Sequence, residues 1–123
     1  MTTGRHEEVA DTRAQLALNV LKVLGLSLEE RGRVFGRPDI RDDDSLITLR
    51  DWLAGNPDSI EILDWIVDIG LWIGILCGNE RASIRKWVAE THGDIDPKQM
   101  LLSGDKETIG RLYAVLGGLI GAK

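Results

Sequence analysis

The chain has 123 residues, enough for one domain or for two small helical subdomains that share a core, and this length argues against a large active-site scaffold. Its apolar share of 43% and charged share of 28% are ordinary for globular proteins, so a disordered chain is not expected. The net charge of -5 excludes a broad basic surface for nucleic acid, and any DNA contact must be local or made by a dimer.

Cellular location is suggested by two further patterns. Residues 1–13 contain no cationic start followed by an apolar core, so we expect no secretory signal and a cytoplasmic protein. The longest apolar run, Ile69 to Cys77, is shorter than the roughly 20 residues that a bilayer requires, and no membrane span is expected. Cys77 is the single cysteine, which excludes an intrachain disulfide and fits a reducing compartment.

The periodicity predicts an all-α protein, because alternation of apolar and polar residues and hairpin turns are nearly absent. Apolar residues recur at helical spacing from Leu16 to Leu24, and Gly25 follows as a helix stop. These signals predict a first helix from about Glu7 to Leu24.

A short second helix and a third helix are expected before residue 56. Ser27 and Glu30 form a capping-box pattern, and the helix that they begin ends near Phe35. Residues 37–44 contain a proline and adjacent acids, which predict a loop. The third helix is expected to begin at an N-cap, either Asp44 or Ser45, and to end at Ala54 and Gly55. The break Asn56-Pro57 divides the chain into predicted regions 1–56 and 57–123.

The next helix is predicted to be the central one. Its cap is expected to be Asp58 or Ser59, and it continues to Cys77. Beyond Asp68 it is apolar on every side, so we expect it to be buried. Three glycines four residues apart predict close packing within the fold or in a dimer; they are Gly70, Gly74 and Gly78.

Three shorter helices complete the predicted bundle. One covers about Glu80 to Glu90 and ends at His92-Gly93. In the next, Asp96 is the N-cap and Pro97 the first helical residue, a position where proline loses no hydrogen bond. Asp105 is expected to cap the last helix, which loosens at glycines 117, 118 and 121.

Motifs for catalysis are largely missing. His6 and His92 are the only histidines, the residue type that most often serves as acid or base in catalysis, and neither stands beside Cys77 in a nucleophile signature. Metal-binding and nucleotide-binding motifs are absent, so no metal, no cofactor and no enzyme activity is expected. The four tryptophans lie in helical patterns and are expected to be core or interface anchors.

One pattern before residue 56 suggests DNA recognition. From Leu24 to Asn56 the order helix, turn, helix is typical of a helix-turn-helix, with Thr48 and Arg50 in the element that would contact DNA. Asp51 opposes such contact by repelling the phosphates. Two interpretations stay open: a DNA reader, and a degenerate helix-turn-helix that serves only for packing.

From Ile60 to Gly121 the chain resembles the toxin-binding domain of the Xre/MbcA/ParS antitoxins, the partners of RES-domain toxins. The resemblance depends on Gly78-Asn79-Glu80-Arg81-Ala82 leading to Arg85-Lys86-Trp87-Val88, and on Pro97 followed by Met100-Leu101-Leu102-Ser103-Gly104-Asp105. Residues Leu24-Gly25-Leu26-Ser27, Phe35-Gly36, Thr48-Leu49, Trp52 and Gly55 are similar to the family's N-terminal helix-turn-helix.

This resemblance implies a function. It implies a type II antitoxin that blocks the active site of an NAD-consuming RES-domain toxin, an ADP-ribosyltransferase-like enzyme. Such a toxin either degrades NAD or transfers ADP-ribose to a protein. The residues that the resemblance places in the toxin contact are Trp87, Met100, Leu101, Gly104 and Asp105. It also permits a homodimer and repression of the antitoxin's own operon.

The apolar C-terminal segment is our candidate for the blocking element. We expect a flexible tail that enters or covers the toxin's NAD cleft, in which glycines follow a narrow groove and apolar side chains become buried. Its residues are Gly118, Leu119, Ile120, Gly121, Ala122 and Lys123. The alternative functions are a helix-turn-helix transcriptional regulator that binds DNA without any toxin, and an orphan helical dimerisation module.

Overall fold

The computed structural model describes the backbone of residues 4–121 and the side chains of residues 12–121. Its elements are α1 (Gly4–Val23), α2 (Leu28–Val34), α3 (Asp43–Ala54), the short 3-10 helix η1 (Pro57–Ser59), α4 (Ile60–Leu76), α5 (Arg81–Ala89), α6 (Pro97–Leu102) and α7 (Lys106–Ile120). No strand occurs in residues 4–121, so the predicted all-α class is confirmed. None of these helices is both long and apolar enough to cross a membrane.

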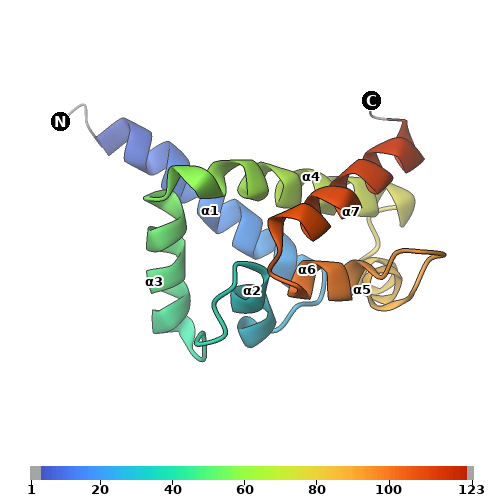
Figure 1. Cartoon of the computed structure of the whole chain (residues 1–123), viewed down its shortest axis with the longest axis horizontal. Coiled ribbons are helices and arrows are strands. Elements are labelled where there is room, and N and C mark those ends of the chain that lie inside the picture. Colours follow the sequence, from blue (N-terminus) through green and yellow to red (C-terminus); the bar gives the residue numbers. More distant parts are fainter. Residues whose placement is uncertain (1–3, 122–123) are drawn as a thin grey trace.

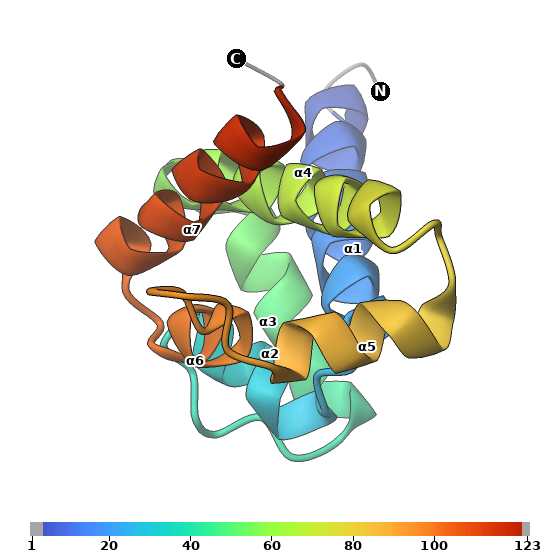
Figure 2. The same cartoon turned by 90° about the vertical axis from the view of Figure 1, so that its right-hand side faces the viewer.

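Helix α4 lies at the centre of the arrangement. It packs most extensively against α1 on one side and α7 on the other, while α3 packs against α1 (Figure 1). The short helices α2, α5 and α6 lie below this layer, as the turned view shows (Figure 2). Helices α1 and α7 therefore cover two sides of α4.

Local capping signals set most helix starts. Ser27 accepts a hydrogen bond from the Glu30 N–H, and the Glu30 carboxylate accepts one from the Ser27 N–H, so the predicted capping box is confirmed. Asp96 and Asp105 cap α6 and α7 as predicted, and Pro97 is the first residue of α6. Helix α1 begins at Gly4, three residues before the predicted start at Glu7.

The predicted cap of α3 was wrong, and the predicted cap of α4 is in place but makes no side-chain hydrogen bond. Helix α3 is capped by Asp42, whose carboxylate accepts from the Ser45 N–H at 2.8 Å, so neither Asp44 nor Ser45 is the N-cap. Ser45 instead returns the bond, because its hydroxyl accepts from the Asp42 N–H. Before α4, Asn56 caps the 3-10 turn η1, and Ser59 occupies the N-cap position without a side-chain hydrogen bond.

The core is continuous across residue 56. One cluster of buried apolar residues includes Leu21 of α1 and Leu49 of α3 together with Ile66 of α4 and Leu112 of α7. A Cβ atom added at Gly70 would collide with Val20 of α1, so this glycine permits the close crossing of α1 and α4. The two predicted regions thus share one core.

Candidate protein-binding surface

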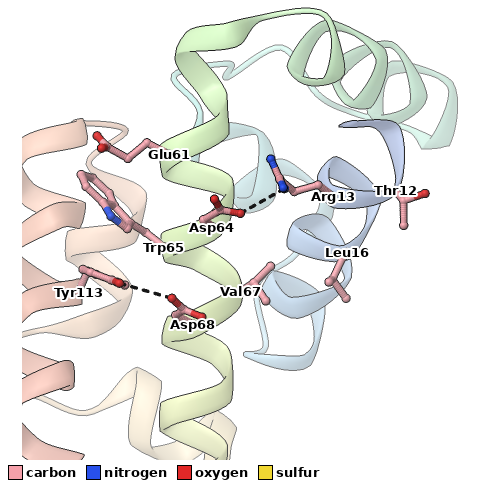
Figure 3. Close-up of a pocket in the computed structure, with 9 residues that line it drawn as sticks. All are labelled: Thr12, Arg13, Leu16, Glu61, Asp64, Trp65, Val67, Asp68 and Tyr113. Carbon is pink, nitrogen blue, oxygen red and sulfur yellow. Dashed lines mark hydrogen bonds and ion pairs between the residues drawn. The ribbon is translucent and has the colours of Figure 1, made fainter. Parts of the chain in front are cut away.

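A groove of about 530 Å³ runs along α4 between α1 and α7 (Figure 3). Its floor consists of α4 residues, chiefly Asp64, Val67 and Asp68. Leu16 of α1 forms one wall and Tyr113 of α7 the other. Because α1 and α7 both pack against α4, residues that lie far apart in the sequence meet along one channel.

Two carboxylates in the groove form exposed ion pairs. Arg13 Nε lies 3.1 Å from Asp64 Oδ1, and Lys106 Nζ lies 2.9 Å from Glu61 Oε1. The side chains of both pairs are at least a third exposed, so water competes with each pair and weakens it. A charged group of a partner can therefore replace one member of each ion pair at little cost in free energy.

Asp68 lies deeper in the groove. It accepts a long hydrogen bond of 3.4 Å from the Tyr113 hydroxyl, and no cationic side chain of residues 12–121 forms an ion pair with it. Burial raises the pKa of Tyr113, and the negative charges of Asp68 and Asp64 raise it further. The tyrosine therefore stays a neutral donor at neutral pH.

Aromatic rings form the α7 side of the groove. Trp65 stacks on Tyr113 with ring centroids 5.6 Å apart, and Trp72 lies 4.9 Å from the same tyrosine. Lys106 Nζ lies 5.8 Å from the Trp65 ring centroid. A second hollow of about 690 Å³ opens on the other side of Trp65, towards Gly110. Aromatic faces beside carboxylates suit cationic side chains.

The far half of α4 is exposed on one face, which corrects the expectation that it is buried on every side. Leu71 is 59% exposed and Ile75 is 56% exposed. The reason is that α1 and α7 cover two sides of α4, and no described element packs over the third. With Leu76, and with Val115 and Leu119 of α7, these residues form what we call the C-terminal surface.

Two residues expected at the toxin contact lie in the core. Leu101 is completely buried and Met100 nearly so, because α6 packs between α2 and α7. Both side chains are covered by neighbouring helices in this structure, and their place in the toxin contact is a prediction of the resemblance alone. Their apolar pattern arises from packing instead.

Trp87 is half-buried at the end of α5. Its indole stacks on the His92 ring with centroids 4.1 Å apart, and His92 Nε2 lies 2.7 Å from the Trp87 carbonyl oxygen. His92 thus satisfies a carbonyl in the last turn of α5, the helix-end position that the sequence suggested. The edge of Trp87 that stays exposed is open to a partner.

The turn before α7 is determined by backbone packing. Gly104 has a φ of +66°, and an added Cβ would lie 2.8 Å from the Arg33 carbonyl oxygen. Asp105 is exposed and accepts from the hydroxyl and the N–H of Thr108, at 2.6 and 3.2 Å. These bonds lower the pKa of Asp105, with the hydroxyl contributing most. Both residues hold the turn between α6 and α7.

The predicted flexible tail is mostly helix. Gly118, Leu119 and Ile120 form the last turn of α7, and Gly121 ends it in the left-handed conformation. Leu119 is 60% exposed, while Ile120 packs against the core. The expectation of a flexible segment is therefore wrong for residues 118–120, because the helical hydrogen bonds continue through them. Ala122 and Lys123 lie outside the described residues.

The two predicted DNA-contact residues lie on α3 among acidic neighbours. The Thr48 hydroxyl donates to the Asp44 carbonyl, and Arg50 Nη2 lies 3.2 Å from Asp51 Oδ1, which neutralises its charge. A helix-turn-helix joins its helices by a turn of about three or four residues. Here the longer segment 35–42 connects α2 and α3, and the helix-turn-helix prediction is not confirmed.

Groups suited to catalysis are scarce in the described part. Among those residues, no set of three or more histidine, cysteine, aspartate or glutamate side chains is placed to hold a metal ion. Burial raises the pKa of the half-buried Cys77 thiol, which opposes formation of the nucleophilic thiolate.

The sequence did not indicate the groove. Its residues come from three segments that are distant along the chain, and each segment reads as an ordinary amphipathic helix. The one available signal was the acidic face of Glu61, Asp64 and Asp68, which helix polarity explains equally well. No family model, no curated protein and no solved structure matches this chain.

Proposed function

We propose that the chain is an antitoxin of a type II toxin-antitoxin system, of the Xre/MbcA/ParS type, that binds and neutralises an NAD-consuming RES-domain toxin. The antitoxin contributes recognition and no chemistry of its own. The motifs of the resemblance lie at the turn before α5, in α5 and α6, and at the cap of α7.

The observation that carries this proposal is the C-terminal surface. Five exposed apolar side chains lie on α4 and α7, two helices that pack against each other and end on the same side of the molecule (Figure 1). Exposed apolar side chains on two neighbouring helices are candidates for burial against a partner protein. A partner that buries Leu119 or Leu71 gains about 1.5–3 kcal/mol for each side chain.

In this proposal the toxin meets the last turn of α7. The side chain of Leu119 stands outward from a helix that is fixed to the core by Leu112 and Leu116. A fixed helix end loses less conformational entropy on binding than a flexible tail would. We propose that the last turn of α7 itself covers the toxin's NAD cleft, so that no extended tail is required.

The test is neutralisation of the toxin encoded in the adjacent reading frame. Cells that produce this toxin should survive with the full chain, and the two proteins should purify together. Leu119→Asp should weaken the complex about 100-fold and abolish protection, because it places a charge in an apolar contact. The matched control is Ile47→Asp on α3, whose side chain is 47% exposed and which should protect fully.

Two results contradict the proposal. One is a folded Leu119→Asp variant that protects as well as the unchanged chain. The other is failure of the unchanged chain to bind the neighbouring toxin; specific retardation of DNA from its own promoter would then favour the transcriptional regulator.

A further inference from the structure

We propose that the groove along α4 is the docking site for an amphipathic helix of the partner protein that is basic at one end and apolar at the other. This inference deepens the proposed function, since it states the chemistry of the toxin segment that binds. Its test uses peptides and does not require the toxin.

The open face of α4 provides a continuous stripe. Asp64, Asp68, Leu71 and Ile75 are spaced by four, three and four residues, a spacing that places them on one face of a helix. Each is exposed or half-exposed. At about 1.5 Å per residue the stripe is about 17 Å long, which matches roughly three turns of a partner helix.

The first half of the stripe favours a cation. Asp68 has no cationic partner among residues 12–121, and the pair of Asp64 with Arg13 is exposed enough to exchange. The faces of Trp65 and Tyr113 lie beside these carboxylates. An arginine or lysine side chain placed here gains a charge-assisted hydrogen bond to a carboxylate, and its apolar stem packs against the neighbouring rings.

The second half of the stripe favours apolar side chains. Leu71 and Ile75 lie one helical turn apart, and both are more than half exposed. An aliphatic residue of the partner at this end would bury both. The groove and the exposed Leu71 and Ile75 beyond it on the same face of α4 therefore select the order of a partner segment, with basic residues over the aspartates and apolar residues over the leucine and isoleucine.

A helix fits this site better than an extended strand. The backbone donors and acceptors within α4 are satisfied inside the helix, so no edge is available for strand addition. Recognition must use side chains at helical spacing, as in other grooves that receive amphipathic helices. A second copy of this chain is the other candidate occupant, but it has the same net charge of -5 and is therefore the poorer match.

The experiment begins with a random library of peptides about 16 residues long, displayed on phage and selected on the immobilised full chain. Selected peptides should have lysine or arginine towards one end and leucine, isoleucine or valine at helical spacing towards the other. The best peptide is then synthesised with a fluorescent label, and its affinity is measured by anisotropy at several salt concentrations.

Two variants separate the halves of the stripe. Asp64→Asn with Asp68→Asn should weaken peptide binding at least about tenfold and flatten its salt dependence, because fewer charges are paired. Leu71→Asp should weaken binding at least about tenfold. The matched control, Asp58→Asn on η1, lies outside the groove and should change the affinity by less than about twofold. Circular dichroism verifies that each variant is folded.

The proposal is overturned if selection yields no peptide of the basic-apolar order, or if the peptide binds equally to the unchanged chain and to folded groove variants. It is also overturned if the unchanged chain sediments as a dimer that Leu71→Asp dissociates, since the occupant is then a second copy. If the chain binds the selected peptides but not the toxin, the proposed antitoxin function is refuted and the docking site is retained. If the variants Asp64→Asn with Asp68→Asn and Leu71→Asp bind the toxin as well as the unchanged chain does, the docking site is refuted and the antitoxin function is retained.

Discussion

At the scale of single residues, packing within the fold can determine the residue type at a position that a family resemblance assigns to the toxin contact. Gly104 belongs to the segment that resembles a toxin-binding motif, and a contact role would explain a glycine there. In the structure its backbone is left-handed and lies against the carbonyl of Arg33, where no side chain fits. Packing alone therefore accounts for this glycine.

Gly104→Ala should destabilise the fold by about 1–3 kcal/mol, because the substitution adds backbone strain and a steric collision. Urea unfolding followed by circular dichroism measures the change. The matched control is Gly118→Ala in α7, where an added Cβ meets no atom within 4 Å and helix propensity should slightly stabilise the chain. Unchanged stability with lost toxin binding in Gly104→Ala would instead support a contact role.

At the scale of elements, competition between adjacent aspartates decides where α3 begins. Asp42, Asp43 and Asp44 are all suitable caps, but only Asp42 faces a serine three residues later that returns the hydrogen bond. Asp42→Ala should therefore lower the melting temperature by several degrees. Asp44→Ala should have a much smaller effect, and equal effects would mean that α3 frays and uses both caps. Thermal unfolding of both variants provides the comparison.

The cap of α7 predicts how stability depends on pH. Hydrogen bonds from Thr108 hold the folded pKa of Asp105 below its ordinary value of 3.8. A lowered folded pKa contributes stability that is complete above the unfolded pKa and is lost as the pH falls through the folded pKa. Asp105→Asn keeps the acceptor and removes the titration, so the free energy of unfolding should decrease less between about pH 5 and about pH 3.

Thr108→Val provides the direct check on this cause. Loss of the hydroxyl donor should raise the pKa of Asp105 towards 3.8, which NMR titration of its carboxyl carbon measures. An unchanged pKa would mean that the hydroxyl does not stabilise the carboxylate.

Helix boundaries could be predicted from the sequence where the signal is local. The Ser27 and Glu30 pair, Pro97 after Asp96, and the Asp105 cap each involve residues within one turn, and all three predictions are confirmed. Predictions that depended on distant packing did not hold. The exposure of Leu71 depends on where α1 and α7 lie, which no pattern within α4 determines.

The same distinction explains the candidate site. The resemblance placed Met100 and Leu101 in the toxin contact, and the sequence alone could not show that both are buried, because apolar pairs look alike in a core and in an interface. The groove could not be predicted, since its walls are formed by helices that meet only in the folded chain. Leu119, which the sequence analysis placed at the contact, is exposed and lies on a helix, while its role in the contact stays a prediction.

At the scale of the whole molecule, α1 and α4 tie the two predicted regions together. Leu18 and Leu21 of α1 belong to the same buried cluster as Leu63 and Ile66 of α4, and Gly70 allows the two helices to approach closely. Neither region can bury its apolar helix faces without the other. The chain should therefore unfold in one cooperative transition, with coincident curves from circular dichroism and tryptophan fluorescence.

The isolated fragment 57–123 tests whether the second region can fold without the first. Without α1, one side of α4 loses its cover, so the fragment should have much less helix than the same residues have in the full chain and should show no cooperative melting. Addition of the fragment 1–56 should restore helix content, because the missing face of the core returns. A fragment 57–123 that folds alone and still binds the toxin would show that the break at Asn56 separates true domains, and that α1 is needed only for the wall of the groove.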